Sequence, residues 1–374
     1  MMPINKRLKR ELKKNFAKYF FIGLVLFMGI TIISAFFTAT DGIMSTIESQ
    51  QSDCNIEDAN VTLVSQLSDD NISRLHEIGI NDLEDTSYCD VTALDDSDYT
   101  MRVFRVRDSV DKLSLIEGEL PANDKQIVLE SKTASAKDLS VGDEIDVDGK
   151  NYTLSGIVAV VDYNNVLQTV SSGVSNLKTF GLGFVSKQAF DGLDSAKMTI
   201  QYSLTAEDEQ SIDDAYNYLM DEEIAVNILK QSDNPRIKSI SDKTNTLKAE
   251  VTLISVVFVL LMVFIFYAMT SASVEKDSNL IGTFFSMGYT RWEIIQHYVR
   301  LPLIITLIGS VLGMITGSLL FAEPIGKITY STYSLPTFSG KVNLYLIIMC
   351  CVIPLIIQFI INCLLLAKKL KTTP

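Results

Sequence analysis

Four apolar stretches without a single charged side chain constrain this chain more than any other feature of its sequence. They are 19 to 24 residues long and comprise Tyr19–Phe37, Val251–Met269, Leu301–Phe321 and Leu344–Ala367. At about 1.5 Å per residue, each is long enough as a helix to cross roughly 30 Å of hydrocarbon. Buried helices of a large soluble protein are the alternative, but charge-free runs of this length are rare outside membranes.

The first stretch also has to be distinguished from a cleaved signal peptide. Its apolar run is longer than the apolar core of such a peptide, and no clean small-residue cleavage site follows it. We therefore expect an uncleaved membrane anchor.

Basic residues predict the orientation. Seven of them precede the first stretch and three follow the last. An even number of spans leaves both ends on one side, and the positive-inside rule makes that side cytoplasmic. We therefore expect a multi-pass cell-membrane protein with this order: a basic cytoplasmic segment 1–18, transmembrane helix 19–40, an extracytoplasmic domain 41–250, helix 251–270, a cytoplasmic loop 271–300, helix 301–321, an extracytoplasmic loop 322–342, helix 343–367 and a basic cytoplasmic tail 368–374.

The net charge of −13 belongs to the large extracytoplasmic block. Residues 41–250 hold 40 acidic and 17 basic side chains, which gives −23, whereas the rest of the chain is basic. Such a balance argues against a nucleic-acid partner. Solubility explains the acidic surface most simply, and a cationic ligand is the weaker alternative.

Residues 41–250 read as an α+β domain, with two subdomains expected. Short β-branched runs predict strands at Val61–Val64, Met101–Val106, Gln126–Leu129, Tyr152–Val161 and Met198–Ser203. Amphipathic spacing predicts helices at Asp70–Ile78 and Ala206–Met220. The Ser- and Gly-rich segment 171–183 reads as a loop or a boundary between subdomains. The fold class is therefore a membrane protein of four transmembrane helices with a large α+β domain between the first and second.

Nothing in this domain resembles a catalytic centre. Its only histidine, His76, lies among charged neighbours, and no hydrolase or zinc motif is present, so we expect neither an enzyme nor a metal site. Cys54 and Cys89 lie on the same predicted side and form a disulfide only if their Cα atoms come within range, which spacing cannot decide.

The predicted cytoplasmic loop has a clear internal order. A short helix carries an apolar face, Gly288 ends it, and Thr290 with Glu293 forms a capping box for the next helix. Its apolar face consists of Leu280, Ile281, Phe284, Phe285 and Met287. Two interpretations stay open: the face rests on lipid headgroups, or it fills a groove on a cytoplasmic partner.

At this loop the chain resembles FtsX-like and MacB-like ABC permeases. The pattern runs from Glu275 through Ile281-Gly282 and Ser286-Met287-Gly288-Tyr289-Thr290 to Glu293-Ile294, His297-Tyr298 and Pro302. The order of one helix, a large outer domain and three further helices is similar too. A weaker likeness covers the outer domain, where Gly118 and Pro121 form a turn before a strand and a Gly142-Asp143 turn.

The resemblance implies a coupling helix that docks into a cytoplasmic ABC ATPase. The residues it assigns to coupling are Glu275, Leu280, Ile281, Gly282, Phe284, Phe285, Met287, Gly288, Tyr289, Arg291 and Glu293. This chain has no Walker motif, so ATP and Mg²⁺ are expected on two copies of a partner ATPase and no cofactor on this chain. A second permease copy or a homologue would complete the complex, and the end of the chain at Pro374 also fits half of a longer permease.

Two groups inside the membrane stretches suggest further roles. Gly309, Gly313 and Gly317 are spaced for close helix packing, although glycine is simply common in membrane helices. Pro354, Gln358 and Asn362 share one face of the last stretch, which fits a solute pathway or helix packing. Apolar periodicity next to the first two spans predicts helical stalks that continue from the membrane to the outer domain.

Two functions therefore stand open, beside a much weaker third. The first is a permease subunit that couples ATP hydrolysis to motion of the outer domain, for export or extraction of a peptide, lipid-like or antibiotic substrate. The second is a non-transporting signalling subunit that regulates a cell-wall enzyme or senses a ligand through an extracytoplasmic protein partner. A membrane-anchored enzyme is the third. Membrane lipids surround the chain in each case.

Overall fold

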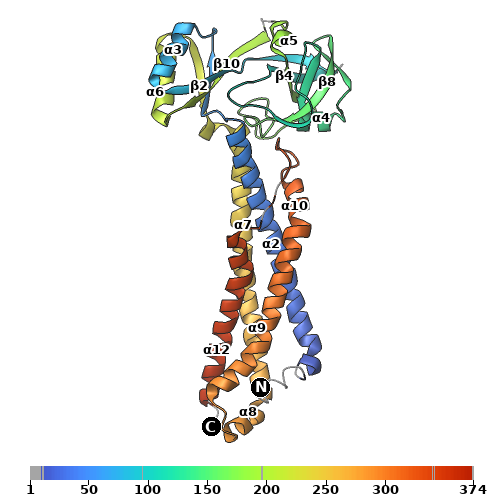
Figure 1. Ribbon diagram of the computed structural model, residues 1–374, viewed down its shortest axis with the longest axis vertical. Helices are drawn as coiled ribbons and strands as arrows, with labels where there is room; N and C mark the ends of the chain where they lie inside the picture. Colours follow the sequence, from blue (N-terminus) through green and yellow to red (C-terminus); the bar gives the residue numbers. More distant parts are fainter. Residues whose placement is uncertain are drawn as a thin grey trace. The chain divides into compact units, whose positions relative to one another are not determined.

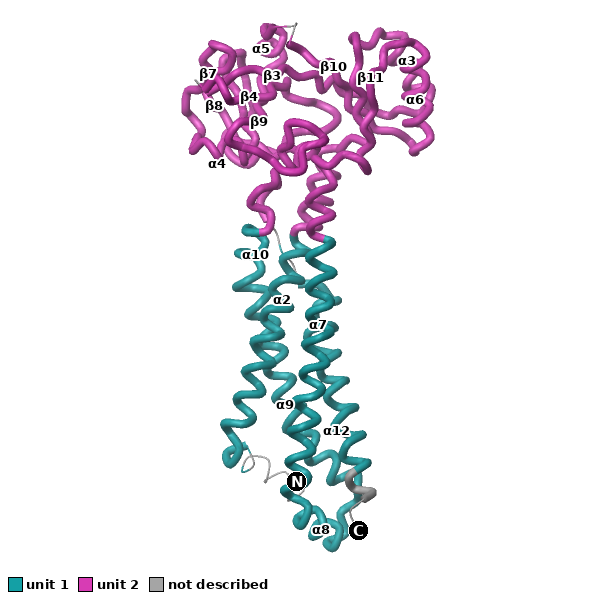
Figure 2. Tube along the Cα trace, turned by 180° about the vertical axis from the view of Figure 1, so that it is seen from behind, with its two compact units in different colours: residues 1–42, 245–328, 339–374 teal, residues 43–244, 329–338 magenta. Residues whose placement is uncertain are grey.

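The computed structural model describes residues 10, 12–94, 96–194, 197–338, 340 and 342–372, with side chains given up to residue 368. Most of the predicted basic segment at the N-terminus and the end of the basic tail lie outside the described residues. The chain divides into two compact units (Figure 2). We call residues 1–42, 245–328 and 339–374 the helical unit, and residues 43–244 and 329–338 the α/β unit.

The helical unit is built on four long apolar helices that lie side by side (Figure 1). They are α2 (Phe16–Asp53), α7 (Pro235–Lys276), α9 (Arg291–Thr316) and α12 (Ile353–Thr372). A π-helical turn at Gly317–Phe321 joins α9 to α10 (Ala322–Thr329), and another at Ile348–Val352 joins α11 (Leu344–Ile347) to α12. The short α8 (Ser278–Ser286) connects α7 to α9. The four helices are long and apolar enough to cross a membrane, as the sequence predicts.

The long helices of the helical unit carry apolar side chains both on their buried faces and on their outward faces. Leu26 and Ile30 of α2 are buried with Phe266 of α7 and Leu301 of α9 in one cluster. Outward-facing side chains of the same helices, such as Leu253 and Phe264 of α7, are more than half exposed. A helix that is hydrophobic all round fits a lipid environment, where its outer face contacts acyl chains instead of water. Together with the four spans, this packing makes the chain a membrane protein.

The described strands of the α/β unit join into one β-sheet. Its central path runs β11-β1-β10-β3-β4-β9-β6-β8-β5, while β2 pairs with β10 and β7 pairs with β3 and β8. The bounds are β1 Ala59–Leu63, β2 Ile80–Asp85, β3 Tyr88–Ala93, β4 Asp96–Arg105, β5 Ser114–Gly118, β6 Gln126–Glu130, β7 Glu144–Val147, β8 Lys150–Ala159, β9 Phe180–Val185, β10 Met198–Ala206 and β11 Ala225–Lys230. Strand β10 pairs with β1 and β2 along one part and with β3 at its start, so it bridges two lobes.

The first lobe packs two helices on an antiparallel sheet. Helices α3 (Asp69–Ile78) and α6 (Glu209–Asp221) bury Leu75, Ile212 and Leu219 against β1, β2 and β10. Both helices begin at a capping side chain, Ser68 for α3 and Asp208 for α6. The capping side chain accepts a hydrogen bond from a backbone N–H group of the first turn, which has no carbonyl of a preceding turn to donate to. The cap therefore fixes where each helix begins.

The second lobe is mixed and has apolar clusters on both faces of its strands. Strand β4 runs parallel to β9, β6 runs parallel to β8, and β6 pairs antiparallel with β9. One cluster contains Met101, Ile127 and Leu154, and the other contains Phe104 and Phe184, whose rings stack at 5.2 Å. The helices α4 (Ser131–Ala136) and α5 (Lys187–Asp191) close the lobe. This mixed α and β architecture confirms the predicted fold class.

Every predicted strand and helix of this domain falls on an observed element, but segment 171–183 does not stay a loop. Its last residues, Phe180–Gly183, begin the fully buried strand β9. A side chain on Gly181 would collide with Tyr99 and Thr133, so the glycines serve close packing inside the sheet. Glycine content alone misled the sequence interpretation here.

Candidate functional site

The predicted loop between the second and third spans folds as the sequence suggests. Helix α8 ends at Ser286 with Met287 as its C-terminal cap, and Gly288 follows with a φ of 86° that favours glycine. The Thr290 side chain then caps α9: Thr290 Oγ1 accepts a bond from the Glu293 amide at 3.3 Å, and the Glu293 carboxylate accepts one from the Thr290 amide at 2.9 Å. This reciprocal pair fixes the reversal of the chain between α8 and α9.

The apolar face of α8 points into the protein's own helical unit. Ile281 and Phe284 are buried with Ile294 and Tyr298 of α9 and Leu366 of α12. The Phe284 ring also meets Tyr289 edge-on, with centroids 5.6 Å apart. Leu280 and Phe285 pack partly buried against the same cluster. Because these side chains hold α8 in place, they are not the ones available to a partner.

A different set of side chains faces outward from the loop. Met287 is 59 % exposed and Trp292 is 53 % exposed, two large apolar groups at the surface. We call the coupling surface the set Gly282, Met287, Gly288, Arg291 and Trp292, all of which are exposed. Trp292 was not among the residues expected from the sequence. Its signal was its place in the first turn of α9, two positions after the capping residue Thr290, where no preceding helix turn covers an apolar side chain.

Two further contacts brace the loop from the α9 side. The Tyr298 hydroxyl donates to the Asp277 carboxylate at 2.9 Å, which joins α9 to the residue before α8. The buried His297 ring lies edge-on to Tyr298 at 5.3 Å. Glu275, which the resemblance also assigns to coupling, is exposed near the end of α7.

The three glycines of the third span lie against α2. A Cβ built on Gly309 would come within 2.8 Å of the Leu26 side chain, and one on Gly313 within 2.8 Å of the Phe27 carbonyl oxygen. Gly317 would place a Cβ against Ser34 and the carbonyl of Thr31. The Ser34 hydroxyl also donates to the Gly313 carbonyl at 3.3 Å. The glycines therefore line a contact in which two helix backbones approach closely.

The polar face of the last span makes contacts typical of helix packing. The Asn362 amide nitrogen donates to the Gln358 carbonyl at 2.9 Å, and the Thr270 hydroxyl of α7 bonds to the Asn362 oxygen. Pro354 and Gln358 line an apolar cavity of about 20 Å³ shared with α2 and α7. A cavity of that size holds roughly one water molecule.

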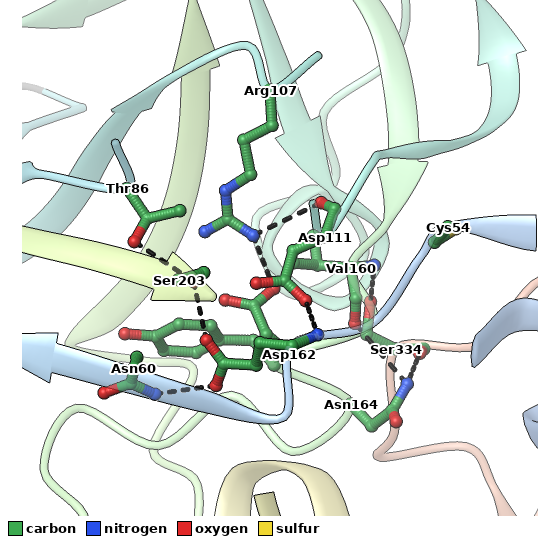
Figure 3. Close-up of polar contacts among 12 residues, drawn as sticks. Cys54, Asn60, Thr86, Arg107, Asp111, Val160, Asp162, Asn164, Ser203 and Ser334 are labelled. Atoms are coloured by element: carbon green, nitrogen blue, oxygen red, sulfur yellow. Dashed lines mark hydrogen bonds and ion pairs between the residues drawn. The ribbon is translucent and has the colours of Figure 1, made fainter. Parts of the chain in front are cut away.

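The α/β unit contains a junction between segments that are distant in the sequence. Asn164, fully buried, donates to Gln50 of α2 at 3.0 Å. It also donates to the Ser334 carbonyl at 2.9 Å (Figure 3). The Ser334 hydroxyl accepts a bond from the Val160 amide at 3.0 Å. Segment 329–338, which was expected to be a simple loop, is therefore docked into the α/β unit together with the end of α2.

The start of α7 docks at the same place. The Arg236 guanidinium donates to the carbonyl oxygens of Leu167 and Gln168 at 3.0 and 2.9 Å, and it lies over the Tyr163 ring at 4.3 Å. Residues 160–168 thus receive contacts from α2, α7 and segment 329–338. We call this region the junction.

The two cysteines of the α/β unit are free thiols, so the disulfide that the sequence left open is not formed. Cys54 Sγ lies 3.0 Å from the Ser114 hydroxyl, whereas Cys89 belongs to the core under β3 and β4. Burial raises the pKa of Cys54, and it raises that of Cys89 to about 11. Buried thiols with raised pKa values are poor nucleophiles and poor metal ligands.

No metal or catalytic cluster appears in the part of the chain that the structure covers. Within those residues, no three His, Cys, Asp or Glu side chains gather so that they could hold a metal ion. His76 is partly exposed, and its Nδ1 lies 2.8 Å from the carbonyl of Ile80, which is a local turn contact.

Comparison with known proteins identifies the helical unit. Residues 252–374 match the family model of the FtsX-like permease C-terminal domain, which covers most of α7 and all of α8, α9 and α12. This part of the chain is therefore similar to the C-terminal domain of FtsX-like permeases. The chain has no significant match among curated proteins.

Two solved structures are similar to part of this chain. One is the extracellular domain of the noncanonical ABC-type transporter YknZ from Gram-positive bacteria, with 14 % identity over 45 % of this chain and 100 % of that one, at a TM-score of 0.30. The other is a domain of a Porphyromonas gingivalis protein assigned as a permease, with 10 % identity over 46 % of this chain and 84 % of that one, at a TM-score of 0.25. At TM-scores this low, neither likeness assigns a fold or a function to this chain.

Proposed function

We propose that this chain is the membrane subunit of an ABC system whose ATPase is a separate cytoplasmic chain. The observation that carries the proposal is the family match over residues 252–374, which includes α8 and the whole coupling surface. Two copies of the ATPase, each with ATP and Mg²⁺, would bind two permease subunits, identical or homologous. The permease itself would carry no catalytic group.

The structure supports two separate roles for the side chains of the loop. Ile281 and Phe284 fix α8 to α9, while Met287 and Trp292 present apolar surface outward. Exposed aromatic and methionine side chains are enriched at the centres of protein interfaces. We therefore propose that the ATPase contacts Met287 and Trp292, and that Gly282 allows close approach because nothing lies within 4 Å of its missing side chain.

Motion would then reach the α/β unit along two helices. Both α2 and α7 continue without a break from residues of the helical unit into residues of the α/β unit. Both end in contacts with the junction, α2 through Gln50 and α7 through Arg236. We propose that the substrate is a peptide, lipid-like or antibiotic molecule handled at the outer face, a class that rests on the family resemblance.

Purification of the full chain in mild detergent, with mass spectrometry of co-purifying proteins, tests the partner. We expect a cytoplasmic ABC ATPase, and a second permease if the complex is a heterodimer. Recovery of the chain alone, or with only an extracytoplasmic protein, would contradict the ATPase partner and favour a sensor or scaffold.

Variants of the coupling surface test the contact. Met287→Ala and Trp292→Ala should each weaken ATPase binding by about 2 kcal/mol, roughly 30-fold, if they are central contacts. Leu319→Ala is the matched control, because Leu319 is an equally apolar and 70 % exposed side chain of the same unit. Unchanged ATPase binding in both variants, at normal yield, would contradict the proposal that the ATPase binds this surface.

A further inference from the structure

Four ionisable side chains are buried together beside the junction and have no part in the proposed function. They are Glu57, Arg107, Asp111 and Asp162, which are 1, 4, 0 and 5 % exposed, and we call them the buried charge cluster. Figure 3 labels Arg107, Asp111 and Asp162. Glu57 lies between α2 and β1, Arg107 and Asp111 lie between β4 and β5, and Asp162 follows β8. The cluster therefore joins three segments that are distant in sequence.

The cluster has more acids than bases. Arg107 Nη1 donates to Asp162 Oδ1 at 2.6 Å and to the Asp111 carbonyl at 3.4 Å. If every group were ionised, three carboxylates would face one guanidinium, and two negative charges would be buried without compensation. Burying an uncompensated carboxylate is so costly that such a group usually takes up a proton instead.

Among the described residues, Arg107 is the cation that acts on Glu57 and Asp111. Strand β10 and the residue before α7 contribute the neutral Ser203 and Asn234. The Cys54 thiol and the Asp53 carboxylate lie at the end of α2. On the other side of loop 107–111, Glu84 accepts bonds from the loop, and Arg105 pairs with both Glu84 at 3.7 Å and Asp85 at 3.3 Å.

The three acids differ in the hydrogen bonds that they accept. Glu57 accepts bonds from Asn60 at 2.6 Å, from Ser203 at 2.6 Å and from Asn234 at 3.4 Å. Asp162 has the short ion pair with Arg107. The hydrogen bonds to Glu57 oppose its burial and the nearby charge of Asp162, which together raise the pKa of Glu57.

Asp111 differs from both. Its Oδ1 accepts one bond, from the Glu57 backbone amide at 2.8 Å, and its Oδ2 has no hydrogen-bond partner within the described residues. It is thus the acid with the least compensation for a negative charge.

We propose that the Asp111 carboxyl group is a buried proton-binding site of the folded α/β unit, because it is fully buried, its Oδ2 has no hydrogen-bond partner within the described residues, and the nearby guanidinium of Arg107 is already paired with Asp162. Burial, followed by the neighbouring charges of Glu57 and Asp162, raises the pKa of Asp111 well above the ordinary 3.8, and Arg107 opposes this only in part. An acid with a raised pKa stabilises the fold fully at low pH, and this contribution is lost as the pH rises through the pKa of the folded state.

Loss of the proton acts on the junction. An ionised Asp111 faces Glu57 and Asp162 as like charges, which pushes apart the segments that carry them. The segment after β8 holds both Asp162 and Asn164, and Asn164 binds Gln50 of α2 and Ser334. The proton on Asp111 therefore tightens the contacts by which α2 and segment 329–338 dock onto the α/β unit, and its release at higher pH loosens them.

Infrared difference spectroscopy of the full chain in lipid nanodiscs tests the site. The wild type should show the carbonyl band of one protonated carboxylic acid well above the titration range of exposed aspartates. Asp111→Asn should lack that band. Asp138→Asn, the matched control, should keep it, because Asp138 is an exposed aspartate with the same φ of 53°.

A second variant keeps the test decisive if Asp111→Asn fails to fold. Glu57→Gln removes a neighbouring negative charge, so the band should persist but disappear at a lower pH than in the wild type. Hydrogen exchange, corrected for intrinsic rates, should show residues 54–64 and 105–113 losing protection as the pH rises. A wild type without the band, a band that survives Asp111→Asn, or a band unmoved by Glu57→Gln would each overturn the proposal.

Discussion

Gly313 of α9 lies so close to Phe27 of α2 that a Cβ on the glycine would stand 2.8 Å from the phenylalanine carbonyl oxygen. Backbone cannot move aside as a flexible side chain can, so only glycine fits this contact without displacement of a helix. Ser34 adds a hydrogen bond to the Gly313 carbonyl at 3.3 Å. This pair fixes how α2 and α9 pack within the helical unit.

Gly313→Leu should therefore destabilise the helical unit. Forcing extra carbons into a packed contact typically costs about 1–3 kcal/mol, and backbone contact puts this site at the upper end. Thermal unfolding in detergent, followed by size-exclusion chromatography, measures the loss. Ile315→Phe adds bulk at a 45 % exposed position of the same helix and should unfold as the wild type does. Equal stability of the two variants would contradict the packing.

Phe284 and Met287 should separate stability from partner contact. Phe284→Ala removes a ring that is 7 % exposed, and cavity formation of this kind costs about 3 kcal/mol. Met287→Ala truncates a side chain that is mostly exposed, so the fold should be unaffected. Limited proteolysis between α8 and α9 should therefore accelerate only in Phe284→Ala. Equal protease resistance in both variants would show that α8 is not held by its buried face.

The capping box gives a third prediction. Thr290→Ala removes the side-chain acceptor for the Glu293 amide and should cost about 1 kcal/mol. Thr290→Ser keeps the hydroxyl and should retain most of the cap. Hydrogen exchange at residues 288–296 reads the difference directly. Wild-type protection in the alanine variant would mean that the cap contributes nothing to the start of α9.

Ser334 offers a test of the junction. Ser334→Ala leaves the buried Val160 amide without its acceptor, which costs about 1–3 kcal/mol. Segment 329–338 should then exchange its amide hydrogens faster. Thr332→Ala, at an exposed position of the same segment, is the control. Exchange that is equally slow in both variants would contradict the docking of this segment through Ser334.

The start of α6 has a pH dependence opposite in sign to that of Asp111. Hydrogen bonds from the Ser211 amide and hydroxyl lower the pKa of Asp208, the exposed capping residue. A lowered pKa stabilises the helix above the unfolded-state value, and the contribution is lost as the pH falls through the folded-state value. Amide protection of residues 209–213 should thus decline in acid, and Asp208→Asn should abolish that decline. The same decline in the variant would refute the role of the carboxylate.

Much of the fold follows from local sequence signals. The length of the charge-free stretches predicts the four long helices. Short apolar runs such as Gln126–Leu129 predict strands, and this run is almost wholly buried in β6. Thr290 and Glu293 predict their capping box, since both partners lie within one helical turn. The family resemblance of the loop is confirmed by the C-terminal match.

The parts that sequence reasoning missed depend on contacts between distant segments. The apolar face of α8 looked like a partner surface, but Leu366 lies 82 positions after Phe284 and only the fold brings them into one cluster. Ser334 and Asn164 carry no pattern that predicts their pairing. Asp111 is one of many aspartates in the sequence. It is buried where the segment between β4 and β5 meets the segments before β1 and after β8. Local sequence patterns do not predict which distant residues come together in the fold.

Photo-cross-linking in native membranes tests the central claim most directly. A photoreactive amino acid at position 287 lies on the coupling surface, and one at position 319 lies on an exposed apolar face elsewhere in the helical unit. We predict a covalent adduct with an ABC ATPase from position 287 and none from position 319. Absence of an ATPase adduct from position 287, with the protein present at normal levels, would contradict the assignment of this loop as the site that couples ATP hydrolysis to the permease.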